Sequence, residues 1–184
     1  MTLIVTGYHG TTQHRAEQIL SHGFRLSTNP WEWLGDGVYF WQDAPTRALV
    51  WSEEWSKRSV AGTGSLAVLR CRLRLEDCLD LLDVNFNELI RELSEEFLQR
   101  LQAEPDAPKL VNYRTGAKRG RHELDAAFFN HLVGRLAKKG LTVGCLRAAI
   151  SEGEPILPDS PICYRSHVQI CIRDLNLIEA IELL

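Results

Sequence analysis

No apolar run in this 184-residue sequence approaches the roughly 20 residues that a membrane-spanning helix needs. The first ten residues, MTLIVTGYHG, lack the basic start and the cleavage site of a secretion signal, so we expect no signal peptide. An excess of basic residues is also missing, because the net charge is −3 and gives no general electrostatic reason to bind nucleic acid. We therefore expect a cytoplasmic protein without a membrane partner.

The sequence also lacks a regular cysteine pattern. Its five cysteines are an odd number without a repeating interval, which fits reduced thiols better than a disulfide framework. Cys163, His167 and Cys171 are four residues apart, like metal ligands. On an extended strand each such step spans roughly 13 Å, too far for one ion to bind all three. We expect no metal site.

Familiar phosphate-binding and nucleophile motifs are missing as well. Residues 62–67, GTGSLA, follow an expected helix and open an expected strand, the reverse of the order that a dinucleotide-binding glycine loop requires. The sequence has no Gly-Lys-Ser/Thr phosphate loop and no serine nucleophile elbow.

Hydrophobic periodicity, which is present, predicts a single α+β domain over residues 1–184. Alternation of apolar and polar residues predicts five strands, at 3–9, 38–41, 65–75, 141–150 and 166–174. Helical spacing and capping residues predict four helices, at 11–22, 44–59, 84–102 and 123–140. The polar stretch 104–122 between the last two helices is expected to be an inserted or flexible segment.

The strand expected near the C-terminus has two different faces. Its apolar face consists of Val168, Ile170 and Ile172. Its other face carries His167, Gln169, Cys171 and Arg173. This pattern suits a strand with one face on the core and one on a wet cleft, although a half-exposed strand with ordinary polar residues has the same pattern.

Three short stretches resemble a known family: YHGTT at 8–12, LGDGVYFW at 34–41 and SHVQICI at 166–172. A His-Gly-Thr, a helix ending in Gly-Phe, a Gly-x-Gly-x-Tyr-Phe strand and a late strand, in that order, are similar to the ADP-ribosyltransferase superfamily. The branch they resemble contains diphtheria toxin and the poly(ADP-ribose) polymerases. The resemblance covers the first third of the chain and its last twenty residues, whereas 76–140 align with nothing and form a partly helical insertion.

The resemblance implies a split antiparallel β-sheet with flanking helices around a cleft for NAD, which is the substrate. His9 would bind the adenine ribose, Gly10 the nicotinamide carboxamide through its backbone, and Thr11 the cofactor's sugars. Tyr39 would stack on the nicotinamide. The remaining cofactor contacts would come from the close-approach glycines Gly35 and Gly37, from Phe40 and from Trp51 on the following helix.

Gln169 stands where this branch commonly has a glutamate on the late strand. An amide can hydrogen-bond a ribose hydroxyl, but it brings no negative charge and accepts no proton. Three interpretations stay open. Another residue (Glu152, Glu154 or His167) activates the acceptor; the acceptor needs no base; or the site binds NAD without turnover.

The sequence thus predicts a mono-ADP-ribosyltransferase that moves ADP-ribose from NAD to a macromolecular acceptor, protein or nucleic acid, and releases nicotinamide. By analogy it would be a bacterial toxin or defence effector, with an antitoxin or inhibitor protein as a further partner. Two alternatives are a non-catalytic NAD- or ADP-ribose-binding module and an NAD-dependent RNA 2′-phosphotransferase. The second would use arginines near the late strand: Arg147, Arg165 and Arg173.

Overall fold

The computed structural model describes residues 2–58, 64–104, 109–113 and 120–184. The helices are α1 (Gln13–His22), α2 (Pro45–Arg58), α3 (Asn87–Ala103) and α4 (Glu123–Lys138). The strands are β1 (Leu3–Thr12), β2 (Val38–Gln42), β3 (Leu66–Leu75), β4 (Cys78–Asp80), β5 (Cys145–Ile150), β6 (His167–Ile172) and β7 (Ile178–Leu183). Much of the expected polar insertion 104–122 lies outside the described residues.

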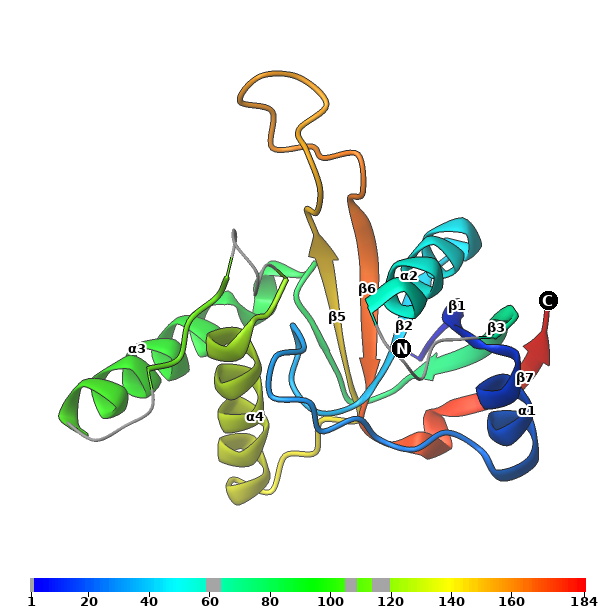
Figure 1. The fold of residues 1–184 in the computed structure, drawn as a ribbon. Helices are drawn as coiled ribbons and strands as arrows, with labels where there is room; N and C mark the ends of the chain where they lie inside the picture. The colour runs from blue at the N-terminus through cyan, green and yellow to red at the C-terminus, as the bar shows by residue number, and fades with distance from the viewer. Residues whose placement is uncertain (1, 59–63, 105–108, 114–119) are drawn as a thin grey trace.

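These strands form one curled sheet of mixed character, in the order β4-β5-β6-β2-β1-β3-β7 (Figure 1). All pairs are antiparallel except β4 with β5. The α+β class predicted from the sequence is therefore confirmed in its coarse form. Strands β4 and β7, at the two edges, were not predicted.

The longest strand pair, β1 with β3, follows from simple alternation. Every second residue of β3 from Ala67 to Leu75 is buried, while Arg70 and Arg72 are exposed. The arginines pair with glutamates of β7, as in Arg72 Nε to Glu179 at 3.0 Å. Strand β1 was expected to turn at Gly10, but it continues to Thr12 because β3 pairs with it along all ten residues.

The helices cover both faces of the sheet. Helix α1 lies on one face, where Ala16 packs in a core cluster with Phe40 and Leu69. Helix α2 lies on the other face over β1 and β3, where Ala48 packs with Trp41 and Val68. Because side chains alternate along a strand, neighbouring residues of β2 and β3 serve opposite faces.

Helices α3 and α4 share the face that α2 covers. They pack over β5 and β6 around buried Leu93, Leu132 and Leu146. Figure 1 shows α4 and α2 on either side of β5 and β6. The boundary between the two packed clusters therefore runs between Tyr39, which contacts the α3–α4 cluster, and Trp41, which contacts α2.

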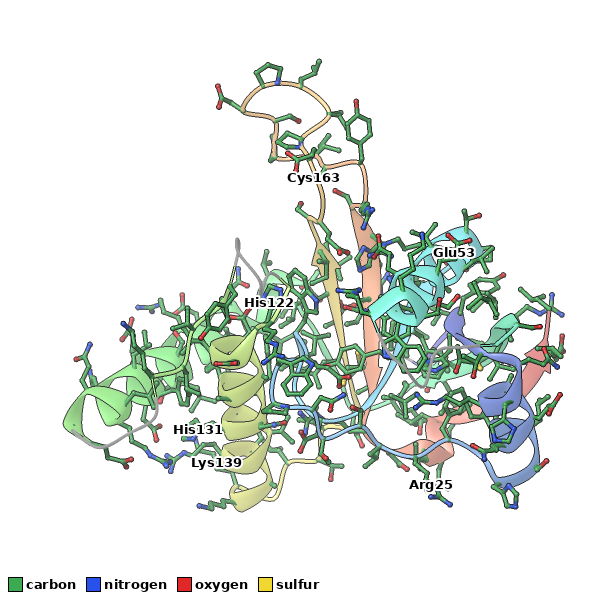
Figure 2. The ribbon with its side chains drawn as sticks, in the orientation of Figure 1. Arg25, Glu53, His122, His131, Lys139 and Cys163 are labelled. Carbon is green, nitrogen blue, oxygen red and sulfur yellow. The ribbon has the colours of Figure 1, made fainter. Side chains whose placement is uncertain are left out.

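A long loop, residues 151–166, joins β5 to β6 and projects away from the rest of the molecule (Figure 1). In Figure 2 Cys163 lies on this loop and the side chains around it point outward. Within the described ranges, no helix combines the length and the apolar character needed to cross a bilayer.

Helix α1 begins and ends where the sequence predicts. The Thr12 hydroxyl oxygen accepts a hydrogen bond from Arg15 N at 3.4 Å, and the helix ends at Gly23, whose φ is 78°. A left-handed φ suits glycine, and Gly23 N donates to Ile19 O at 2.8 Å. This turn brings Phe24 back over the sheet, where it packs against His9.

We expect Gly37→Ala to destabilise the fold by about 2 kcal/mol, because a Cβ there would lie 2.3 Å from Cys171 Sγ in a packed core. The matched control is Gly134→Ala on α4, where nothing lies within 4 Å of the added Cβ. That change should stabilise by about 0.5–1 kcal/mol through helix propensity. Urea unfolding of both variants measures the difference; equal stability for the two would contradict the packing described.

Candidate active site

Strands β1 and β2 pair over only a short length. Strand β1 pairs with β3 from Leu3 to Thr12, but in the described structure it pairs with β2 only through Gly7 and Tyr8. Beyond these two residues, a side-chain hydrogen bond joins the strands, because His9 Nδ1 of β1 lies 2.9 Å from Tyr39 O of β2. Two residues predicted from distant motifs therefore meet where the β1–β2 ladder ends.

The surroundings of His9 fix the tautomer of its ring and lower its pKa. A carbonyl oxygen only accepts, so Nδ1 donates to Tyr39 O and Nε2 is left with a lone pair. The ring packs against Phe24 at 5.2 Å and Phe40 at 5.8 Å between centroids. Burial lowers the pKa of His9, the bond to Tyr39 O opposes this, and nearby Arg15 lowers it further.

Tyr39 points to the opposite face of the sheet from His9. Its hydroxyl donates to Gly35 O at 2.6 Å and accepts from Leu34 N at 2.9 Å. Burial is the main cause that raises the pKa of this phenol far above its usual value. The hydroxyl is therefore occupied by the preceding loop, and the ring packs against the α3–α4 cluster.

The loop before Tyr39 is fixed to the protein by its glycines and by polar side chains. Gly35 has a φ of 75°, and a Cβ there would lie 2.4 Å from Asn130 Oδ1. Asn130 Nδ2 donates to Asp36 Oδ1 at 3.0 Å, and Arg173 Nη2 donates to Leu34 O at 3.2 Å. In this structure Gly35 and Gly37 make room for α4 and β6, whereas the sequence predicted that they make room for a cofactor.

Packing within the protein also explains why position 10 is a glycine. A Cβ on Gly10 would lie 1.9 Å from Ala48 O, so α2 sits directly on this part of β1. A side chain is excluded at this position, as expected, but Ala48 O of the protein excludes it and not an atom of a cofactor.

Gln169 lies in the middle of β6, opposite Trp41 of β2. It is only 5% exposed, and its Oε1 has no hydrogen-bond partner among the described residues. The prediction that this face of β6 borders a wet cleft is wrong, because α2, α3 and α4 cover it and Cys171 is fully buried. Burial raises the pKa of the Cys171 thiol to about 12.

Gln169 belongs to a group of four residues that we call the polar cluster: Trp41, Arg47, His167 and Gln169. Each has a buried nitrogen or oxygen without a partner within the described ranges: Trp41 Nε1, Arg47 Nε and Nη1, His167 Nε2, and Gln169 Oε1. Leaving a buried hydrogen-bonding group unpaired costs on the order of 1–3 kcal/mol. Several such atoms in one place indicate a site that a bound molecule or water completes.

Ring contacts and an ion pair connect members of the polar cluster. The Arg47 guanidinium carbon lies 5.5 Å from the centre of the Trp41 ring, and the Trp41 and His167 rings are 6.3 Å apart. Arg47 Nη2 also forms an ion pair with Glu152, the first acidic residue of the projecting loop. The Arg47 side chain is 11% exposed and that of Glu152 is 32% exposed, so the arginine is the more buried partner of this pair.

His167 has the geometry of a general base. Its Nδ1 donates to Arg165 O at 2.7 Å, which leaves Nε2 as the acceptor inside the polar cluster. Burial lowers the pKa of His167, the bond to Arg165 O raises it, and Arg47 lowers it further while Glu152 opposes. A neutral imidazole with a fixed tautomer can take a proton at Nε2.

The other predicted residues occupy different positions. Glu154 lies exposed in the projecting loop, whereas Glu152, the alternative to it, contacts the polar cluster through Arg47. Phe40 has no exposed surface, so it can support His9 but not touch a ligand in this arrangement. Thr11 is buried against the core, and the Trp51 ring lies 5.6 Å from Trp41 on the shared face.

The three arginines considered for RNA binding are all engaged within the protein. Arg147 Nη1 bonds Asp80 at 2.9 Å, Arg165 pairs with Glu54 at 2.5 Å, and Arg173 Nη2 bonds Asn130 at 2.6 Å. Nothing in these contacts favours an exposed basic groove at the late strand.

Sequence reasoning missed Arg47 and Trp41 as site residues and Asn130 as an anchor of the loop. From the sequence alone, Arg47 is an ordinary arginine of an expected helix, and Trp41 is an ordinary core aromatic. A signal was available for Trp41, since it shares the strand parity of Tyr39. No comparable signal marks Arg47 or Asn130, because their roles come from contacts with other elements.

No protein-family model matches the chain, and no curated protein matches it. Within the part of the chain that the structure describes, no group of three or more histidines, cysteines, aspartates or glutamates could hold a metal ion.

The buried histidines predict acid sensitivity. His9 and His167 have folded-state pKa values below the ordinary value near 6.5, so the unfolded chain binds more protons. Stability should therefore be constant above about pH 7 and should fall as the pH drops below about 6.5. Urea unfolding between pH 5 and 7.5 measures the slope, and His9→Gln should flatten it relative to the exposed control His14→Gln. An unchanged slope in His9→Gln would show that His9 ionises freely in the fold.

Proposed function

We propose that this protein is a mono-ADP-ribosyltransferase that cleaves NAD and transfers ADP-ribose to a macromolecular acceptor. The observation that carries the proposal is the junction at the end of the β1–β2 ladder, where His9 bonds the main chain of Tyr39 and β6 places Gln169 next to β2. The three motifs of the sequence resemblance are thus on adjacent strands of one sheet, in the order β6-β2-β1.

The chemistry needs two rings immobilised and a developing cation stabilised. When the bond between the ribose C1″ and the nicotinamide nitrogen breaks, its electron pair goes to the ring nitrogen and positive charge develops on the sugar. A dinucleotide that crosses this junction would meet His9 on one face of the sheet and Tyr39 on the other. His9 Nε2 would accept a ribose hydroxyl, and the Tyr39 ring would stack on the nicotinamide.

Gln169 would hold the nicotinamide ribose. Its unpartnered Oε1 can accept a hydrogen bond from a sugar hydroxyl, which also compensates for its burial. Because an amide brings no charge, we expect single-unit transfer rather than polymer elongation. The neutral His167, with Nε2 free, is the residue best placed to take the acceptor's proton, and Glu154 is not.

The projecting loop is the surface we assign to the macromolecular acceptor. Four large apolar side chains on it are well exposed: Ile156, Leu157, Ile162 and Tyr164. Exposed apolar groups of this kind are typical of contact surfaces. The loop leaves the body of the protein at Glu152, which pairs with Arg47, and returns at His167, so the base of the loop adjoins the polar cluster.

The unlinked state of all five cysteines supports a reducing, cytoplasmic setting for the enzyme. A role as a bacterial toxin or defence effector, held in check by an antitoxin or inhibitor protein, remains part of the proposal by analogy.

A non-catalytic module that binds NAD or ADP-ribose is the second candidate, and Gln169 is the observation that favours it. A site without a carboxylate can hold the ribose and still lack the charge that stabilises the transition state. Binding of NAD without nicotinamide release would decide for this candidate.

Nicotinamide release from NAD tests the proposed activity. His9→Ala and Gln169→Ala should each lower the rate by about 100-fold, since each removes an interaction made to a ribose in the transition state. His14→Ala, an exposed histidine on α1, should leave the rate unchanged. Chromatography of the products measures the release. Wild-type protein that binds NAD and releases no nicotinamide, with any acceptor or with water, would falsify the transferase assignment.

The role of the loop is tested separately. Leu157→Ser with Tyr164→Ser should leave nicotinamide release into water unchanged, because neither side chain contacts the junction, and should lower transfer to macromolecules from a cell extract at least tenfold. The matched control is Leu98→Ser, another exposed leucine, on α3. Radiolabelled NAD followed on a gel measures the transfer, and equal labelling by both variants would remove the loop from the proposal.

A further inference from the structure

Helix α2 covers the polar cluster, yet few apolar contacts hold it there. Of its 14 residues, all of which the structure describes, only Ala48 and Ser52 are buried, and Trp51, which packs with Ala48, is only partly buried. Helix α4, on the same face of the sheet, buries Leu132 and Leu136. Because buried apolar surface is the main force that holds a helix on a sheet, α2 is packed less firmly than α4.

Two ion pairs fasten α2 to the base of the projecting loop. Arg47 pairs with Glu152. Two helical turns further along α2, Glu54 Oε1 lies 2.5 Å from Arg165 Nη1. The loop presents the opposite charges side by side, because Arg165 N donates to Glu152 O at 3.0 Å. We call these four residues the clasp.

The arrangement that the clasp maintains leaves polar groups unsatisfied beneath α2. Trp41 Nε1, His167 Nε2 and Gln169 Oε1 are buried without a hydrogen-bond partner among the described residues. Each of these atoms would be hydrogen-bonded in contact with water, so its burial destabilises the closed arrangement. The clasp therefore acts against the tendency of the polar cluster to become hydrated.

We infer that α2 is a lid over the polar cluster and that the clasp keeps this lid closed. Few buried apolar contacts are typical of segments that open locally, and unmet polar groups beneath such a segment favour opening. Figure 1 shows α2 beside β6, the strand that carries His167 and Gln169. A ligand can reach His167 Nε2 and Gln169 Oε1 only when the lid is open, because both atoms are buried while it is closed.

The clasp is open to water on its outer side, which makes the lid sensitive to salt. The side chains of Glu54, Glu152 and Arg165 are all partly exposed. Dissolved ions screen charges in such positions, so the two ion pairs weaken as the ionic strength rises. We therefore expect the lid to open more often at high salt.

Hydrogen exchange at Trp41 Nε1 measures the opening of the lid. This N–H has no partner among the described residues, so burial under α2 protects it. Its signal in a ¹H–¹⁵N spectrum is the one that Trp41→Phe removes. Glu54→Gln and Arg165→Gln should each raise its exchange rate about fivefold, the effect of losing one ion pair of this kind. For the unaltered protein, about 1 M NaCl should raise the rate similarly.

Two controls separate lid opening from other changes. Exchange of the Leu132 amide, which lies in the packed core on α4, should not change in these variants, because global unfolding is not involved. Arg91→Gln breaks an exposed ion pair with Glu88 on α3 and should leave the Trp41 signal unchanged.

Charge reversal tests the clasp itself. Glu54→Arg places two arginines together and should speed exchange more than Glu54→Gln does, and adding Arg165→Glu should slow it again. Unchanged exchange at Trp41 in both glutamine variants would overturn the lid. Failure of Arg165→Glu to slow the Glu54→Arg variant would also overturn it.

An arm with NAD rests on the proposed function. If NAD binds beneath the lid, Glu54→Gln should lower its Kd by about the factor by which exchange rises, because the open fraction sets the apparent affinity. Faster exchange in a protein that neither binds nor cleaves NAD would support the lid and remove the transferase assignment. Cleavage of NAD with exchange unchanged in the clasp variants would overturn the lid and leave the transferase assignment standing.

Discussion

The pairing of β1 is the constraint on which the candidate site depends. Strand β1 uses one edge fully, along β3, and the other edge for only two residues, along β2. A strand edge that leaves its ladder exposes main-chain groups that must find other partners. Here His9 reaches across and binds Tyr39 O, so the divergence of two strands is stabilised by a side chain from one of the motifs.

Close approach of backbone to backbone explains the glycines around this junction. Gly10 lies under Ala48 O of α2, and Gly37 lies against Cys171 and Ile172 O of β6. The first contact brings α2 close to β1 on one face of the sheet, and the second brings β6 close to the start of β2, its neighbour within the sheet. As a consequence Arg47, carried by α2, and Gln169, carried by β6, are buried on either side of Trp41.

The polar cluster contains five of the nine buried side-chain nitrogen and oxygen atoms that lack a hydrogen-bond partner among the described residues, and the other four belong to Glu32, His131, Arg135 and Arg173. Elsewhere on this face, Tyr39, Asp36 and Asn130 bond one another or the loop before β2. On the opposite face, Arg147 bonds Asp80 and Gln42. Consistency between local chemistry and fold is the usual state of a natural protein, and departures from it concentrate at functional sites. Four neighbouring side chains with unmet bonds are therefore the strongest reason to look for a ligand here.

Strand periodicity and helix caps are local properties, and the sequence by itself determined them. The alternation in β3, the Thr12 cap and the Gly23 end of α1 follow from side-chain burial and backbone preference within a few residues. The same alternation predicted which residues of β6 share a face, but not that both faces are buried, because burial depends on α2, α3 and α4 from other parts of the chain. Only the tertiary structure decided that Arg47 and Trp41 join His167 and Gln169, and that Glu152 reaches them through Arg47. These contacts join residues more than 100 positions apart, and no short-range pattern records such pairings.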